Sequence, residues 1–128
     1  MNRFLLLILG GCFLGIAPYS QAMGDVEKGR EFFNDVQGGN CRNCHSTKGT
    51  KLVGPGLRDV MVRHSEEWIR TFVTDPQQSW EMDHPETVEL KQRVRGTKRK
   101  YPICQKGTMT EETKDNLIEF LESLTVKE

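Results

Sequence analysis

Apolar residues recur at helical spacing along this 128-residue sequence, and no long segment alternates apolar and polar residues as a strand would. The C-terminal segment has the clearest pattern. Its apolar residues follow one another at intervals of three and four: Leu117, Phe120, Leu121 and Leu124. Thr110 stands before them as an N-cap, and Glu111 and Glu112 suit the positive end of a helix dipole. The pattern predicts a final helix with one buried face.

A first helix is predicted near residue 25. In residues 25–33, Gly29 and Phe33 are four residues apart and therefore share a face. The Gly-Gly-Asn run at 38–40 ends this segment. A glycine-rich loop is expected from residue 48 to residue 58.

Two more helices are expected in the middle of the chain. Ser65 is a good N-cap for the first of them, which carries Trp68 on an apolar stripe. The Asp75–Pro76 pair stops that helix, because a residue before proline avoids the helical conformation. Another helical piece opens at Asp83–Pro85 and runs towards Val94. The sequence therefore predicts an all-α protein.

The N-terminal segment reads as a secretory signal peptide. Arg3 precedes an apolar run at residues 4–17, and Ser20 and Ala22 suit cleavage after residue 22. The run is shorter than the ~20 residues that a transmembrane helix needs, so we expect no membrane span. The residues around Cys12 loosely resemble a lipoprotein box, which leaves lipidation open. We expect residues 1–22 to be removed, residues 23–128 to form one domain, and the protein to reach the periplasm or an equivalent compartment.

The charges of the chain balance. Lys and Arg number 18, and so do Asp and Glu, so the formal net charge is zero. Such a chain has no overall positive field with which to attract nucleic acid, and we expect no nucleic-acid partner. A domain of this size also has a marginal core on its own, and a buried prosthetic group would add apolar mass.

The segment Cys41-Arg42-Asn43-Cys44-His45 is a C-x-x-C-H motif. In c-type haem attachment, the two thiols bond to the two vinyl groups of haem and the adjacent histidine binds the iron. A zinc site would need a second pair of ligands, and after cleavage only one other cysteine remains. A thioredoxin-like pair would need a βαβ setting, which the pattern does not predict. The motif predicts one covalent haem c, held by Cys41 and Cys44, with His45 as the proximal iron ligand.

The chain resembles class I cytochromes c over almost all of its length after residue 22. The resemblance rests on the first helix, the C-x-x-C-H motif, the Val53–Leu57 loop, the segment from Trp68 to Pro76 and the final helix. It implies the cytochrome c fold, with the first and last helices crossing at Gly29 against Phe120 or Leu121. It also implies that the Pro55 carbonyl faces a ring nitrogen of His45, a contact that orients a ligating histidine.

The resemblance fails at the second axial ligand. The family usually carries a Met-Pro pair shortly before the last helix, and here that stretch reads Lys100-Tyr101-Pro102-Ile103-Cys104-Gln105-Lys106-Gly107. Cys104 is the unpaired third cysteine of the exported chain and falls within a residue or so of the expected methionine. A thiolate favours ferric over ferrous iron, so Cys104 as the distal ligand predicts a low reduction potential. The neighbouring lysine and arginine side chains would help to keep the sulfur deprotonated.

Other readings of the distal face stay open. Cys104 could instead be a buried thiol or half of an intermolecular disulfide. Met109 is the fallback ligand, although its position suits a core methionine at the start of the last helix. Met61 and Met82 come too early in the chain by the same comparison. His64 and His84 are candidates for bis-histidine ligation. Polar capping residues flank both, so we expect both to be exposed.

With Cys104 as ligand, the chain is similar to the small His/Cys-ligated cytochromes c (NaxL and NaxS type) of anaerobic ammonium-oxidising bacteria. That resemblance implies a homo- or heterodimer with a related cytochrome and binding of nitric oxide or carbon monoxide in the reduced state. The alternative function is ordinary periplasmic electron transfer with His/Met ligation. A sulfur-transfer enzyme that uses Cys104 is a third reading, which a single haem motif disfavours. We therefore expect no enzymatic activity.

A basic stretch lies before the last helix. It contains no acidic residue, and its cations are Lys91, Arg93, Arg95, Lys98, Arg99, Lys100 and Lys106. Such a run is either a solvated loop or a docking surface for an acidic redox partner, near Lys98–Lys106 and beside the haem.

Overall fold

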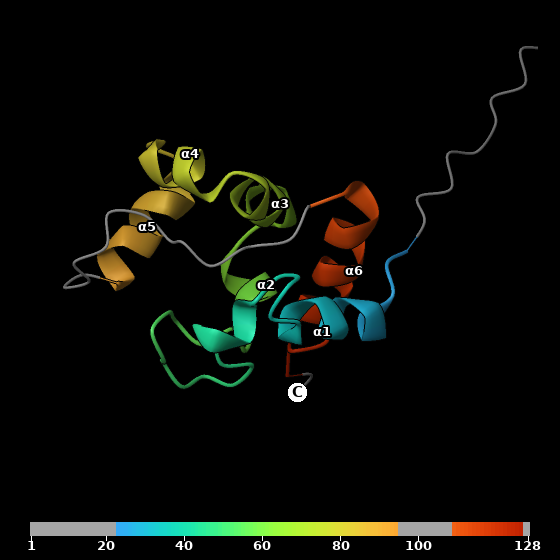
Figure 1. Cartoon of the computed structure of the whole chain (residues 1–128). Coiled ribbons are helices and arrows are strands. Elements are labelled where there is room, and N and C mark those ends of the chain that lie inside the picture. Colours follow the sequence, from blue (N-terminus) through green and yellow to red (C-terminus); the bar gives the residue numbers. More distant parts are fainter. Residues whose placement is uncertain (1–22, 95–108, 127–128) are drawn as a thin grey trace, which may run out of the picture.

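A computed structural model describes residues 23–94 and 109–126 of the chain, and the structural statements below refer to these residues. They form six α-helices and one short 3-10 helix, with no strand among them (Figure 1). The all-α prediction is confirmed. Three predictions concern segments outside the described residues: the signal peptide at residues 1–22 with Cys12, the distal ligand Cys104, and the docking surface near Lys98–Lys106.

Helices α1 (Val26–Asn34) and α6 (Glu111–Glu122) pack against each other. Gly29 lies at their crossing, where an added Cβ would come within 2.0 Å of the Asn116 carbonyl oxygen and 2.8 Å of the Phe120 Cβ. The rings of Phe33 and Phe120 pack beside it with centroids 5.3 Å apart. The predicted contact of Gly29 with Phe120 is confirmed, and only a residue without a side chain allows so close an approach.

Four helices form the rest of the domain (Figure 1): α2 (Val60–Arg63), α3 (Glu66–Thr74), α4 (Pro76–Glu81) and α5 (Pro85–Arg93). Ser65 caps α3 by accepting a hydrogen bond from the Trp68 backbone N–H, as predicted. Thr110 caps α6 in the same way, through the Thr113 N–H.

Asp75 and Pro76 have a double role that the sequence did not reveal. Asp75 ends α3 and its carboxylate also caps α4, in which Pro76 occupies the first turn. Proline lacks a backbone N–H, but the first turn of a helix does not need one, so the same pair that stops one helix begins the next. The short helix α2 was not predicted either. It follows Asp59, which adopts a left-handed conformation with φ 58°.

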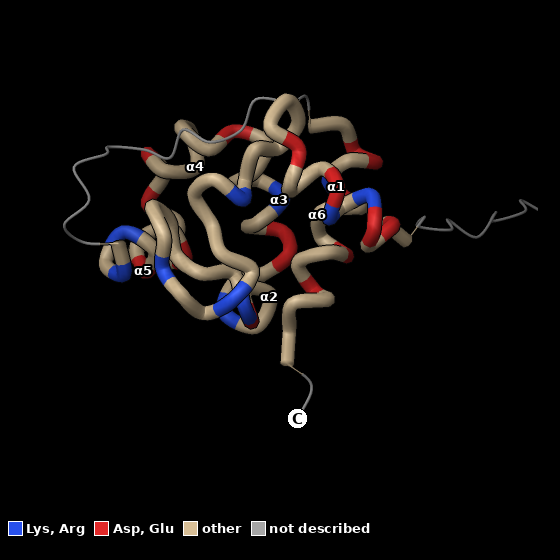
Figure 2. The backbone as a smooth tube through the Cα atoms, turned by 60° about the horizontal axis from the view of Figure 1, so that its bottom comes forward, with Lys and Arg blue, Asp and Glu red and all other residues tan. Residues whose placement is uncertain are grey.

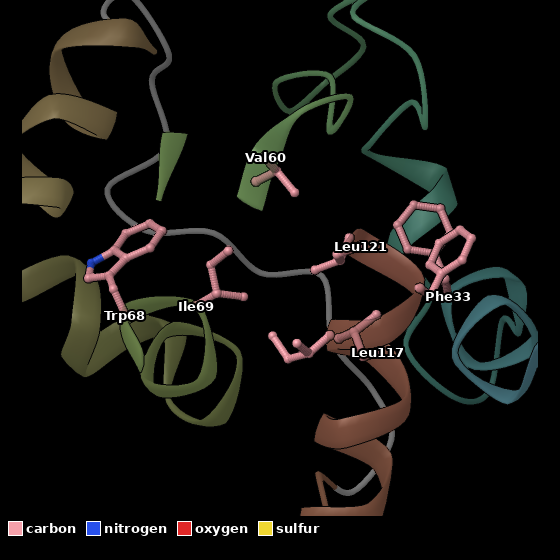
Figure 3. Close-up of a cluster of buried hydrophobic side chains, with 8 residues drawn as sticks. Phe33, Val60, Trp68, Ile69, Leu117 and Leu121 are labelled. Carbon is pink, nitrogen blue, oxygen red and sulfur yellow. The ribbon is translucent and has the colours of Figure 1, made fainter. Parts of the chain in front are cut away.

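The core lies between α2, α3 and the α1–α6 pair. Eight apolar side chains are buried there: Phe33, Val60, Trp68, Ile69, Leu117, Ile118, Phe120 and Leu121. Figure 3 shows Trp68 and Ile69 on one side, facing Val60 and the side chains of α6 across the middle of the domain.

Candidate functional site

The C-x-x-C-H motif folds into a single tight turn. Residues Cys41–Asn43 form the 3-10 helix η1, and the Cys41 carbonyl accepts hydrogen bonds from the backbone N–H of Cys44 at 3.0 Å and of His45 at 2.9 Å. Asn40 enters the turn in a left-handed conformation, with φ 55°. The turn gathers two thiols and an imidazole into one place, and all three side chains belong to half-buried residues.

The ring of His45 is held by the loop that follows the motif. Its Nδ1 lies 2.9 Å from the carbonyl oxygen of Pro55, as the family resemblance implied. The Gly54 N–H donates to the Cys44 carbonyl at 2.8 Å, and the Leu57 N–H donates to the Ser46 carbonyl at the same distance. These bonds tie the loop back to the motif. An acceptor at Nδ1 fixes the proton there and leaves Nε2 as the nitrogen for a metal.

Gly54 packs directly against the same ring. A Cβ at this position would lie 2.5 Å from Cε1 of His45 and 2.9 Å from both ring nitrogens. Burial lowers the pKa of His45 below its ordinary value, and the hydrogen bond with Pro55 offsets part of that shift. The imidazole is therefore neutral near pH 7, which is the form that binds a metal.

A cavity of about 980 Å³, partly open to solvent, adjoins this ring. Cys41, His45 and Pro55 line one part of it, and six of the eight buried core residues line most of the rest. Its mainly apolar wall suits a large planar hydrophobic group.

One part of the cavity wall is cationic. Arg63 from α2 and Arg93 from α5 both line it. The Arg63 guanidinium donates to the carbonyl oxygens of Arg58 and Gly56, while its buried Nε has no hydrogen-bond partner among the described residues. Burial and the charge of Arg93 lower the pKa of Arg63 from its ordinary value, and nearby acids offset this only in part.

These features fit haem c. The two thiols lie in the turn beside the cavity, the oriented histidine faces a mainly apolar wall, and Arg63 has a spare buried donor for a propionate carboxylate. A buried N–H without an acceptor is costly, so an anionic ligand group at this point would complete the site. The sequence found the turn, but it did not single out Arg63 or the cationic wall.

The structure contradicts one expectation. His64 was expected to be exposed, but it is only 6% exposed and lines the same cavity. Its ring stacks on Trp68 and Nδ1 lies 3.1 Å from the Glu86 carboxylate, so apolar contact and an ionic partner together hold it inside. No helical period predicts this burial, because α2 ends at Arg63, His64 has extended backbone, and α3 begins only at Glu66. His84, in contrast, is exposed as expected.

The three candidate methionines are not among the described residues that line the cavity. Met109 is half-buried and packs against the core cluster, and it is not among the described residues that line the cavity. Met61 also packs against the core, and Met82 is exposed.

Several lysine and arginine residues lie on α5 and α2, the helices that contribute Arg93 and Arg63 to the cavity wall. Figure 2 shows Lys and Arg positions on α5 and near α2. Lys91 and Arg93 lie in the last turn of α5 and Arg63 in the last turn of α2.

Among the described residues, no helix is both long and apolar enough to cross a bilayer.

Comparison with known proteins identifies a relationship over most of the chain. Residues 26–125 match the family model described as Cytochrome c. No curated protein matches the chain. The matched region contains the turn at Cys41–His45, the Pro55 loop and the helices that enclose the cavity.

Proposed function

The chain belongs to the cytochrome c family, and from this premise we propose that it is an exported, low-potential haem protein whose iron is bound by His45 and Cys104. As a member of this family it carries covalently attached haem c and serves electron transfer. The haem supplies an iron that accepts and donates one electron at a time. In this proposal Cys41 and Cys44 form the thioether bonds, and Pro55 orients His45.

The observation that carries the assignment of the proximal side is the 2.9 Å contact between His45 Nδ1 and the Pro55 carbonyl. Histidines that ligate metals almost always donate their other ring N–H to such an acceptor. The contact fixes one tautomer, and Gly54 leaves room for the loop to approach the ring closely. The chain thus holds the imidazole in position before any metal bond contributes.

The proposal for the distal side rests on the sequence. Cys104 falls within a residue or so of the position where the family carries its methionine, and Lys100 and Lys106 on either side would favour the thiolate. The packing of Met109 against the core supports a structural role for that methionine. A thiolate donates more electron density to iron than a thioether, and axial ligands as a class move haem potentials over ~0.8 V. We therefore expect a potential well below that of a His/Met cytochrome.

The same ligand suggests a role beyond electron transfer. Ferrous iron attracts a thiolate less than ferric iron does. On reduction, the sulfur of Cys104 is therefore expected to take up a proton and dissociate from the iron. Nitric oxide or carbon monoxide would then bind in its place, as the resemblance to the NaxL and NaxS type implies. A homo- or heterodimer with a related cytochrome, and an acidic redox partner near Lys98–Lys106, belong to the same proposal. Export is supported by the signal-like residues 1–22 and by the family, whose members are typically exported.

Electron paramagnetic resonance of the ferric protein tests the distal ligand. We expect a low-spin thiolate signal in the wild type that disappears in Cys104→Ala and persists in Met109→Leu, the matched control. The opposite result, with the signal altered only in Met109→Leu, would replace the proposal with ordinary His/Met electron transfer. An absorption spectrum of the ferrous protein that carbon monoxide leaves unchanged would exclude the gas-binding role.

A further inference from the structure

His64 is a buried ionisable residue in the wall of the haem pocket. It ends α2, and its side chain is only 4% exposed. Its ring stacks on Trp68 with centroids 4.5 Å apart and an angle of 24° between the planes. Histidine is the side chain whose charge changes most readily near neutral pH, so its burial beside a redox centre calls for a physical account.

Glu86 is the hydrogen-bond partner of the His64 ring. Oε2 of Glu86 lies 3.1 Å from Nδ1 of His64 and also accepts a hydrogen bond from the Ser65 N–H at 2.9 Å. The Ser65 hydroxyl donates to the other carboxylate oxygen. Burial raises the pKa of Glu86, but the hydrogen bonds from Ser65 and His64 together lower it below its ordinary value. Glu86 therefore remains a carboxylate and accepts a hydrogen bond from the Nδ1–H group.

Opposing influences act on the charge of this imidazole. Burial lowers the pKa of His64, and Arg93 on α5 acts in the same direction. Glu86 and Glu89, also on α5, favour the protonated ring. Arg63 precedes His64 in the chain and adds a further positive charge to the cavity wall. The protonation of His64 therefore depends on a balance of nearby charges, and a change of one unit in the pocket will shift it.

We propose that His64 is a proton-binding residue coupled to the redox state, which gains a proton from solvent when the protein gains an electron from its redox partner. The electron lowers the positive charge of the iron centre, and the added proton restores it at the wall. No bond to the iron forms or breaks at His64. The inference rests on the haem of the proposed function. Proton uptake by Cys104 on reduction would add a separate pH dependence, which His64→Gln would leave in place.

The coupling has a definite sign. Reduction removes positive charge from the pocket, so the pKa of His64 is higher in the reduced protein than in the oxidised protein. By linkage, protonation of His64 raises the reduction potential by the same free energy. The potential should fall as pH rises between these two pKa values and should be constant above and below that interval.

A redox titration at a series of pH values tests the inference, with the potential as the readout. We expect the potential to fall with pH less steeply in His64→Gln than in the wild type, and as steeply as in the wild type in His84→Asn, a control at an exposed histidine. In Glu86→Gln, loss of the negative partner should lower the pKa of His64 and move the sloping interval to lower pH. A wild-type potential that does not change with pH, or a pH profile that is the same in His64→Gln as in the wild type, would overturn the inference.

A measurement on the wild type covers the case in which His64→Gln fails to fold. Nuclear magnetic resonance of ¹³C-labelled histidine should show the His64 resonance titrating at higher pH in the reduced protein than in the oxidised one. Identical titrations in the two states would refute the coupling. Failure of the His/Cys proposal would appear in the electron paramagnetic resonance spectrum of the ferric protein, whereas failure of this inference would appear as identical pH profiles in the wild type and His64→Gln.

Discussion

Replacement of Gly54 by alanine tests the way in which the loop holds His45. The new methyl carbon would lie 2.5 Å from Cε1 of the ring, whereas unstrained carbon–carbon contacts are ~3.5–4.0 Å apart. The ring or the loop must therefore move by about 1 Å. The loop is not free to move without cost, because the Gly54 N–H donates to the Cys44 carbonyl at 2.8 Å inside the haem-binding turn.

The expected loss of stability follows from this geometry. Overpacking of a tight site costs about 1–3 kcal/mol. For a domain of this size, each kcal/mol lowers Tm by roughly 4–8 °C. Displacement of the ring also lengthens the 2.9 Å contact with Pro55, so the ligand should be held less firmly. We expect a lower Tm together with a changed ferric absorption spectrum.

Gly49→Ala is the matched control, because it makes the same chemical change in the same loop. The nearest atom to its added methyl would be Nη2 of Arg58, at 3.1 Å, on an exposed side chain that can move aside. Its Tm should stay close to that of the wild type. If Gly54→Ala and Gly49→Ala have equal Tm values and the same spectrum, close packing of the loop does not position His45.

Three further results are expected. Gly29→Ala should destabilise the domain by about 3 kcal/mol or more, because its methyl carbon would lie 2.0 Å from the Asn116 carbonyl oxygen. A Tm within error of the wild type would contradict the tight crossing of α1 and α6. Arg63→Met should lower the reduction potential, because a positive charge in the wall of the cavity would favour the reduced iron. Exposed Arg58→Met is the control, and an equal change in both variants would contradict a special role of Arg63. The free energy of unfolding should fall on acidification. Burial lowers the pKa of His64 in the folded protein, so as pH falls below ~6.5 the unfolded chain binds this proton before the folded protein does. The loss of stability continues until pH has fallen below the pKa of His64 in the folded protein. Denaturant unfolding at several pH values should show this loss in the wild type and a smaller loss in His64→Gln.

The helices could be largely predicted from the sequence because their signals are local. Ser65 and Thr110 are N-caps within the same few residues that they stabilise, and the spacing of apolar residues marks the buried face. Helix α4 was missed because Pro76 was interpreted only as a stop, although proline is equally suited to a first turn. Helix α2, with four residues, is too short to show a period.

The proximal side of the candidate site could be proposed from the sequence for the same reason, because Cys41, Cys44 and His45 lie within five consecutive residues. The wall of the cavity was not, because it depends on tertiary contacts. Arg63 and Arg93 lie thirty positions apart and meet the cavity only when α5 folds against the α2–α3 segment, where Glu86 binds both His64 and Ser65. The burial of His64 depends on the same contact. Polar flanking residues suggested exposure, and a partner from another helix reversed it.

The hydrophobic core and the haem pocket share most of their side chains. Of the eight buried apolar residues that the structure describes, six line the cavity, and Figure 3 labels these six. A chain of this length buries limited apolar surface by itself, so a haem among these side chains would contribute much of the core. Changes that loosen the pocket should therefore lower stability and alter the environment of the iron together. Substitutions at Ile118 or Phe120, which are buried but do not line the cavity, should lower stability with a smaller effect on the haem spectrum.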